Sequence, residues 1–350
     1  MGLIRFRSAL LSALVLSAAA LFGPVAAFAQ AKIVHLHDPA HDVKWLEWLQ
    51  LSKEKFEAAN PDVEVEILVP ASRTDQLDKI VAMYATGILP DVIETFPTVG
   101  YEFALDGIYR DISPYMEKET ALGWTDFFPI AVESSKVLSG ERAGTVWMLP
   151  VSIFTLGFAF NLNHFSEAGL VAPTDRDNPW TWDDFIEMGV RLTKVGPGGE
   201  VERYATWIQG TWDRWLGWVH NAGEYPFDEY ILPASSRFRT ESVRAALQLW
   251  QDMYFNLRFA MYGGSGARLH QGLTSFVVAT PSFTNQYESV YQGTVDYDFG
   301  PFPKRERAGS EVLTLGVAMG AQSSNPEAAW RWMKFLATEA AEDHIAVTGR

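Results

Sequence analysis

Residues 31–95 read AKIVHLHDPAHDVKWLEWLQLSKEKFEAANPDVEVEILVPASRTDQLDKIVAMYATGILPDVIET, and their pattern of apolar residues indicates the fold class. Short apolar runs bounded by turn residues predict strands, and apolar residues three and four apart predict helices. The predicted elements are, in order, strand Ala31–Leu36, helix Val43–Ala59, strand Val63–Ile67, helix Arg73–Thr86 and strand Asp91–Ile93. This order is typical of a parallel sheet with crossover helices, so an α/β fold is expected, with ligands beyond the carboxyl ends of the strands.

The rest of the chain is predicted to form a second α/β unit. Residues Thr145–Asn161, TVWMLPVSIFTLGFAFN, form a near-continuous apolar run, as expected where a chain passes from one domain into a buried strand of the next. Further predicted elements are a helix capped by Thr181 and running to Val195, helix Glu241–Asn256, strand Ser275–Ala279, a helix beginning at Pro281, strands Tyr297–Phe302 and Val312–Gly320, and a helix beginning at Pro326. Two domains are therefore expected.

The first 29 residues are predicted to be a secretory signal peptide. Arg5 and Arg7 precede an apolar segment, Ala9–Phe22, and the small-residue pattern Ala27-Phe28-Ala29 follows it. This apolar segment is too short to be a permanent membrane span. The mature chain would begin at Gln30, and because the sequence has no cysteine, neither a lipid anchor nor a disulfide is expected. The sequence thus predicts a protein exported to the periplasm and not lipid-anchored.

Composition narrows the class of partner. The formal net charge is −15 at pH 7, and basic patches of the kind that bind nucleic acid are missing, so nucleic acid is not an expected partner. The chain carries 13 Trp, 12 Tyr and 22 Phe, more tryptophan than a core of this size needs. Flat aromatic faces stack on sugar rings, although ordinary core packing is the default for any single ring.

The sequence lacks the local motifs of the common enzyme classes. It contains no Gly-x-Ser-x-Gly, His-Glu-x-x-His, Walker loop or dinucleotide fingerprint, and no cofactor is expected. Asp183 and Asp184 are adjacent, but in the first turn of a helix neighbouring side chains point apart and acidic residues favour the helix dipole. We expect no enzymatic activity. A secreted glycoside hydrolase with two carboxylates distant in sequence remains an alternative, because such pairs carry no local motif.

The run HLHDPAH at residues 35–41 has a competing interpretation as a metal site. His35 and His37 would point to the same face of a strand, and with Asp38 and His41 they offer ligands suited to zinc. The favoured interpretation assigns no metal. A secreted metal-capture protein that uses His35, His37 and His41 stays open as an alternative.

Six motifs, in order and spread over nearly the whole mature chain, resemble a known family. They are FEAANPDVEVEI (Phe56–Ile67), TGILPDVIE (Thr86–Glu94), LDGIYRDISPYM (Leu105–Met116), VWMLPVSIFTLGFAFNLNHFSEAGLVAP (Val146–Pro173), WTWDDF (Trp180–Phe185) and GVAMGAQSSNPEAAWRWMKFL (Gly316–Leu336). Together they resemble extracellular solute-binding proteins of the maltose-binding type (family 1), which serve ATP-binding-cassette sugar importers in the periplasm.

The resemblance implies a type II periplasmic-binding-protein fold, in which two α/β lobes joined by crossing strands enclose a ligand cleft. It places the N-terminal lobe at residues 30–147 and 316–348 and the C-terminal lobe at 148–315. The crossings are expected near Met148–Ser152, near Leu313–Gly316 and near Gly349. Family members usually continue with further helices of the second lobe, so the chain is expected to lack that segment.

The resemblance also implies a function: a monomer that binds a sugar or sugar alcohol, closes on it, and delivers it to the permease subunits of the importer. The ligand-binding residues that it implies lie at loop tips and at the hinge; they are His37, Asp38, His41, Trp45, Thr95, Phe96, Ser152, Phe154, Gln209, Trp212, Asp213, Trp215, Ser282 and Phe283. The family often places a stacking tryptophan after Pro281, where this sequence has none. The stacking role is then expected to fall to Trp212 or Trp45.

Overall fold

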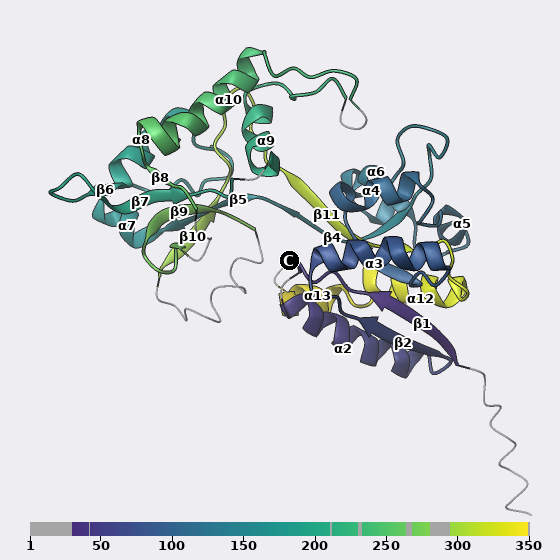
Figure 1. The fold of residues 1–350 in the computed structure, drawn as a ribbon. Coiled ribbons are helices and arrows are strands. Elements are labelled where there is room, and N and C mark those ends of the chain that lie inside the picture. The colour runs from purple at the N-terminus through teal and green to yellow at the C-terminus, as the bar shows by residue number, and fades with distance from the viewer. Residues whose placement is uncertain are drawn as a thin grey trace, which may run out of the picture.

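The computed structural model describes residues 30–41, 43–210, 212–229, 233–263, 268–280 and 295–348. Figure 1 shows two lobes, each built around its own sheet and joined by two long strands. The expected α/β architecture with two lobes is confirmed. In the described part of the chain, no helix is both long and apolar enough to cross a membrane.

The first lobe holds a five-stranded sheet in the order β2-β1-β3-β11-β4. Its strands are β1 (Ala31–Leu36), β2 (Val63–Leu68), β3 (Val92–Thr95), β4 (Met148–Thr155) and β11 (Val312–Met319). Its helices are α2 (Val43–Ala59), α3 (Arg73–Thr86), α4 (Pro97–Leu105), α5 (Ser113–Met116), η1 (Trp124–Asp126), α6 (Pro129–Ser134), α12 (Pro326–Ala337) and α13 (Ala341–Thr348). β1 lies parallel between β2 and β3, as the order of elements predicted.

Helices cover both faces of this sheet, which explains why apolar residues stand at successive positions of its central strand β3. Neighbouring residues of one strand enter opposite cores: Val92 packs in the core that includes α2 and α12, and Ile93 in the core that includes α3 and α4. Side chains of a strand alternate between faces, so a two-sided sheet requires apolar residues at successive positions.

The second lobe holds a six-stranded sheet in the order β10-β5-β9-β7-β6, with β8 paired to β7. Its strands are β5 (Gly157–Asn161), β6 (Lys194–Val195), β7 (Val201–Trp207), β8 (Ala260–Met261), β9 (Thr274–Ala279) and β10 (Tyr297–Gly300). Its helices are α7 (Leu162–Glu167), α8 (Trp182–Leu192), α9 (Trp212–Asn221), α10 (Glu241–Gln251) and the π-turn η2 (Asp252–Asn256). α8 ends before the expected Val195, and α10 passes into a π-turn where one continuous helix was expected.

The core of the second lobe accounts for much of the aromatic content. Phe158, Phe160, Trp180, Phe185 and Trp218 are all buried and pack ring against ring. Rings at these separations prefer edge-on and tilted contacts, and most of the pairs have that geometry. The excess of tryptophan and phenylalanine is therefore largely structural.

Strands β4 and β11 carry the chain between the lobes. They pair antiparallel from Val312 and Thr155 to Ala318 and Met148, within the first sheet, and the register shifts between Leu315 and Gly316. β5 begins at Gly157 in the second sheet, so the sheets change just after Thr155, later along the chain than the expected Met148–Ser152. The third expected crossing, near Gly349, lies outside the described residues.

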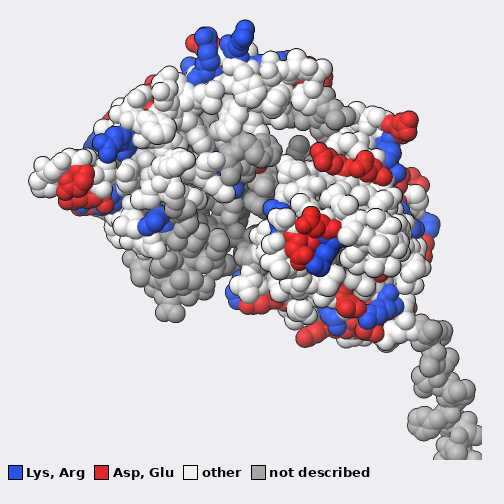
Figure 2. Space-filling model, viewed as in Figure 1, with Lys and Arg blue, Asp and Glu red and all other residues white. Residues whose placement is uncertain are grey.

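Figure 2 shows the surface hollowed between the two lobes, with acidic and basic side chains interspersed over the face in view. In Figure 1, β1 and β2 run toward the other lobe, so their carboxyl ends lie on the side of the first lobe that faces this hollow. That edge is where open α/β sheets bind ligands.

Candidate ligand-binding cleft

A buried carboxylate, Glu94 near the end of β3, organises the cleft side of the first lobe. Its Oε1 lies 3.1 Å from Nε2 of His35 and accepts a hydrogen bond of 3.0 Å from Nε1 of Trp45. Its Oε2 accepts the backbone N–H of Asp38 at 2.9 Å. Three donors thus hold a charged group that is 2% exposed, which compensates for much of its lost hydration.

Two further histidines approach the same carboxylate oxygen. Nδ1 of His37 lies 2.8 Å and Nδ1 of His41 lies 3.2 Å from Oε2 of Glu94. The parallel pairing of β1 and β3 explains this convergence, since Leu36 is level with Ile93 and the next residues of both strands leave the sheet at one edge.

The pKa shifts in the cluster favour a negatively charged Glu94 and a positively charged His37. Burial alone would raise the pKa of Glu94, but hydrogen bonds from His35, His37 and His41 hold it well below its ordinary value. Burial alone would lower the pKa of His37, but its hydrogen bond to Glu94 and the negative charge of that carboxylate raise it. The two groups therefore stabilise each other in their charged forms.

His35 and His41 have different roles in this cluster. His35 is fully buried and uses both ring nitrogens, because Nδ1 accepts a 2.9 Å hydrogen bond from Nε1 of Trp332 while Nε2 faces Glu94. His41 is held only through Nδ1; within the described part of the chain, its buried Nε2 has no hydrogen-bond partner. His35 is thus fixed as a packing residue.

A rigid arginine lies beside the cluster. Arg73, the first residue of α3, donates to Asp38 through Nε (3.2 Å to Oδ1) and Nη2 (2.7 Å to Oδ2). Its guanidinium carbon lies 4.5 Å from the centre of the Phe96 ring. The Arg73 side chain is 35% exposed, whereas Asp38 is buried. The bidentate bond and the ring fix one orientation of the guanidinium, and within the described residues its Nη1 makes no hydrogen bond.

The structure brings six of the predicted site residues together around Glu94 and Arg73: His37, Asp38, His41, Trp45, Thr95 and Phe96. Ser152 lies on crossing strand β4, where it pairs with Leu315 of β11. Trp45 is 1% exposed, and its ring packs against His41, Trp48 and His344 in the core. It offers no free face for stacking on a solute. Phe154, also on β4, is half-buried against the first core.

The predicted residues of the second lobe lie apart from this group. Gln209 is exposed just after β7, and Trp215, in α9, packs on its own lobe's core with its ring 6.0 Å from that of Phe238. Trp212 and Asp213 open α9, and their side chains are not among those described. Ser282 and Phe283, together with the helix expected at Pro281, lie outside the described residues.

Sequence reasoning missed Glu94 and Arg73. Glu94 lies in a four-residue strand with no chemical motif around it, and its histidine partners are more than fifty positions earlier. Arg73 reads as an ordinary first-turn residue of a helix. The available signal was positional: Glu94 lies near the carboxyl end of β3 and Arg73 at the start of α3, and both lie in space beside residues 35–41.

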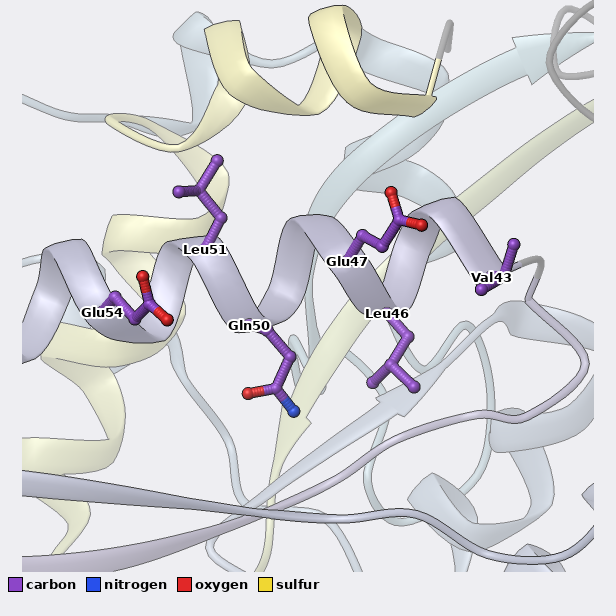
Figure 3. Close-up of a pocket in the computed structure, with 6 residues that line it drawn as sticks. All are labelled: Val43, Leu46, Glu47, Gln50, Leu51 and Glu54. Carbon is purple, nitrogen blue, oxygen red and sulfur yellow. The ribbon is translucent and has the colours of Figure 1, made fainter. Parts of the chain in front are cut away.

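A separate groove of about 460 Å³ follows α2 (Figure 3). Its lining residues recur three and four apart and so share one face of the helix; they are Val43, Leu46, Glu47, Gln50, Leu51 and Glu54. The buried face of α2 is a different one, formed by Trp45, Trp48, Leu49, Ser52 and Phe56. The groove contains none of the predicted ligand residues.

Comparison with known proteins places these features in context. A family model described as bacterial extracellular solute-binding protein matches residues 44–343. No curated protein matches the chain.

Solved structures share the fold at low sequence identity. The substrate-binding protein Lmo0181 of Listeria monocytogenes, in complex with cycloalternan, is 18% identical with a TM-score of 0.77, over 92% of this chain and 79% of that one. Maltose-bound MalE3 of T. maritima is 23% identical with a TM-score of 0.71, over 91% and 80%. UgpB of Mycobacterium tuberculosis, in complex with glycerophosphocholine, is 18% identical with a TM-score of 0.75, over 91% and 78%.

Proposed function

The chain belongs to the family of bacterial extracellular solute-binding proteins, and from this premise we propose that it captures a sugar or sugar alcohol between its lobes. It then delivers the solute to the permease subunits of an ATP-driven importer. Residues 1–29 direct export to the periplasm, where the protein acts as a monomer. It carries out no chemistry on the solute.

The observation that carries this proposal is the pair of crossing strands. Each lobe has its own sheet and its own core, and β4 and β11 pass between them. Two bodies joined by a pair of strands can rotate about that connection without unfolding either core. A solute that contacts both lobes stabilises the closed arrangement, and closure creates the surface that the permease recognises.

The chemistry at the edge of the first lobe suits a polyhydroxylated solute. Arg73, oriented by the buried Asp38, offers charged donors that form strong hydrogen bonds with hydroxyls, next to the flat ring of Phe96. Exposed Gln209 and the ring of Trp212 supply the corresponding groups from the second lobe. The solved relatives bound to cycloalternan and maltose support a carbohydrate, and the one bound to glycerophosphocholine supports a polyol phosphate as the nearest variant.

The proposal is tested by thermal unfolding of the protein lacking residues 1–29, in the presence of sugars, sugar alcohols, glycerol phosphates, amino acids, polyamines and divalent metals. A solute that binds only the folded state raises the midpoint. We expect a selective rise with one sugar, sugar alcohol or polyol phosphate. A rise with only an amino acid or a polyamine would contradict the assigned solute class, and persistent release of reducing sugar would establish a hydrolase instead.

The same assay tests the role of Arg73. Arg73→Ala removes the charged donors and should weaken solute binding at least about tenfold, on the scale of a charge-assisted hydrogen bond. Arg191→Ala is the matched control, because Arg191 is an exposed residue of α8 paired with Glu187. Equal affinity of the two variants would remove Arg73 from the site.

A further inference from the structure

Three side chains at the cleft edge of the first lobe have the arrangement of an incomplete coordination shell. One ring nitrogen from each of His37 and His41 and one oxygen of Glu94 lie within 4.8 Å of one another. Their side chains are 3%, 5% and 1% exposed. Glu94 lies on β3 and His37 directly follows the neighbouring parallel strand β1, so the sheet fixes where these two meet, while His41 approaches them from the loop after β1.

The distances to the carboxylate fit adjacent metal ligands. Oε2 of Glu94 lies 2.8 Å from Nδ1 of His37 and 3.2 Å from Nδ1 of His41. Ligands bound to zinc at its usual bond lengths and tetrahedral angles lie about 3.3 Å apart. The widest ligand separation, up to 4.8 Å, exceeds this value by up to about 1.5 Å, so zinc binding would draw the ligands closer together by that amount.

The hydrogen-bond partners of each residue indicate which side chains could bind a metal and which only support them. Glu94 is oriented by His35, Trp45 and the Asp38 backbone, so its position does not depend on His37 or His41. Such outer contacts are what orient a ligating carboxylate. His35 uses both ring nitrogens and is therefore excluded as a ligand.

Hydrogen bonding also distinguishes Asp38 from His41. The Asp38 carboxylate is neutralised by Arg73 and is excluded as a ligand for that reason. His41 forms a hydrogen bond through Nδ1 alone within the described part of the chain, so its ring, which packs against Trp45, is less constrained by hydrogen bonds than that of His35.

We propose that His37, His41 and Glu94 bind one zinc ion, with a fourth coordination position open to water from the cleft. Two imidazoles and one carboxylate with an open position form a well-known type of zinc site. Each ring coordinates through Nδ1 and carries its proton on Nε2. The earlier alternative based on His35, His37 and His41 is thereby revised, because Glu94 takes the place of His35.

The test uses the chain lacking residues 1–29, stripped of metal with a chelator and kept free of any solute. Zn²⁺ is titrated by calorimetry, and Co²⁺ is added as a visible probe of coordination. We expect one Zn²⁺ per chain and the intense visible absorption of low-coordinate Co²⁺. The measurement does not involve the transported solute, so its failure would leave the proposed function untouched.

Variants make the assignment specific. His41→Ala, in a loop, should weaken zinc binding at least about 100-fold, since loss of an outer-sphere partner alone costs 10–100-fold. His164→Ala is the matched control, because His164 lies in the second lobe beside Ser275. Glu94→Gln, which keeps the side-chain shape, provides a second test and should have the same effect. Absence of saturable binding, or equal affinity of His41→Ala and His164→Ala, would overturn the proposal.

Discussion

At the scale of single residues, the protein places titratable groups where their surroundings decide their charge. In the first lobe, Glu94 stays ionised in the core because donors surround it, and its pKa is held low. In the second lobe, His164 is kept neutral. Burial and the positive charge of nearby Arg203 lower its pKa to about 4.

The His164 shift makes a prediction about pH. Its folded pKa lies below the ordinary value of 6.5, so the unfolded chain takes up a proton first as pH falls. The contribution of His164 is fully present above pH 6.5 and is lost progressively as pH falls toward about 4. We expect His164→Gln to lose less stability than the parent between these limits, in urea unfolding followed by tryptophan fluorescence. Parallel pH profiles for the two proteins would contradict the assignment.

The sequence pointed to residues 35–41 as part of the candidate site, but it did not predict which groups they contact. The run HLHDPAH was recognised, but its interaction with Glu94 depends on strand pairing between segments distant in sequence, which no local pattern encodes. The same limit applies to Trp45. An aromatic residue in the first turn of a helix has one sequence signature whether it faces a cleft or the core.

At the scale of elements, clear turn signals at the ends of helices and strands explain which boundaries were predicted correctly. β1, β2, α2 and α3 were predicted nearly to the residue, helped by turn signals such as Gly87, which has the left-handed φ of +78°. β3 was predicted as Asp91–Ile93 but covers Val92–Thr95. The end of α10 was not predicted. Apolar residues continue through residues 252–256, where the backbone changes to a π-turn with i→i+5 hydrogen bonds, and the local sequence carries no signal of this change.

The close pairing of β4 and β11 makes a second prediction. At Gly316, where the register shifts, an added Cβ would lie 2.4 Å from the backbone oxygen of Leu149. Gly316→Ala should therefore lower the free energy of unfolding by about 2 kcal/mol, as overpacked sites do.

Gly210→Ala is the control, because a Cβ there would meet nothing within 4 Å. The two changes are compared by urea unfolding. A loss at Gly316 no larger than that at Gly210 would show that the crossing strands can separate at little cost.

At the scale of the whole molecule, the described residues form two separate cores connected by β4 and β11, an arrangement suited to the proposed coupling of solute binding to lobe closure. Each sheet buries its own apolar residues, so a change in the angle between lobes exposes neither core. In the proposed mechanism, a solute would supply the free energy that favours the closed arrangement, and it would do so only if it contacts both lobes. The proposed function therefore depends on closure of the two lobes around a solute.

The most direct test is the distance between the lobes. The chain has no cysteine, so Asp78→Cys in α3 and Arg244→Cys in α10, both exposed, can be labelled without background. The distance between the labels is measured with and without a saturating concentration of the solute that raises the midpoint of thermal unfolding. A shorter distance that appears only with that solute is the predicted result. An unchanged distance at saturation would contradict closure as the mechanism.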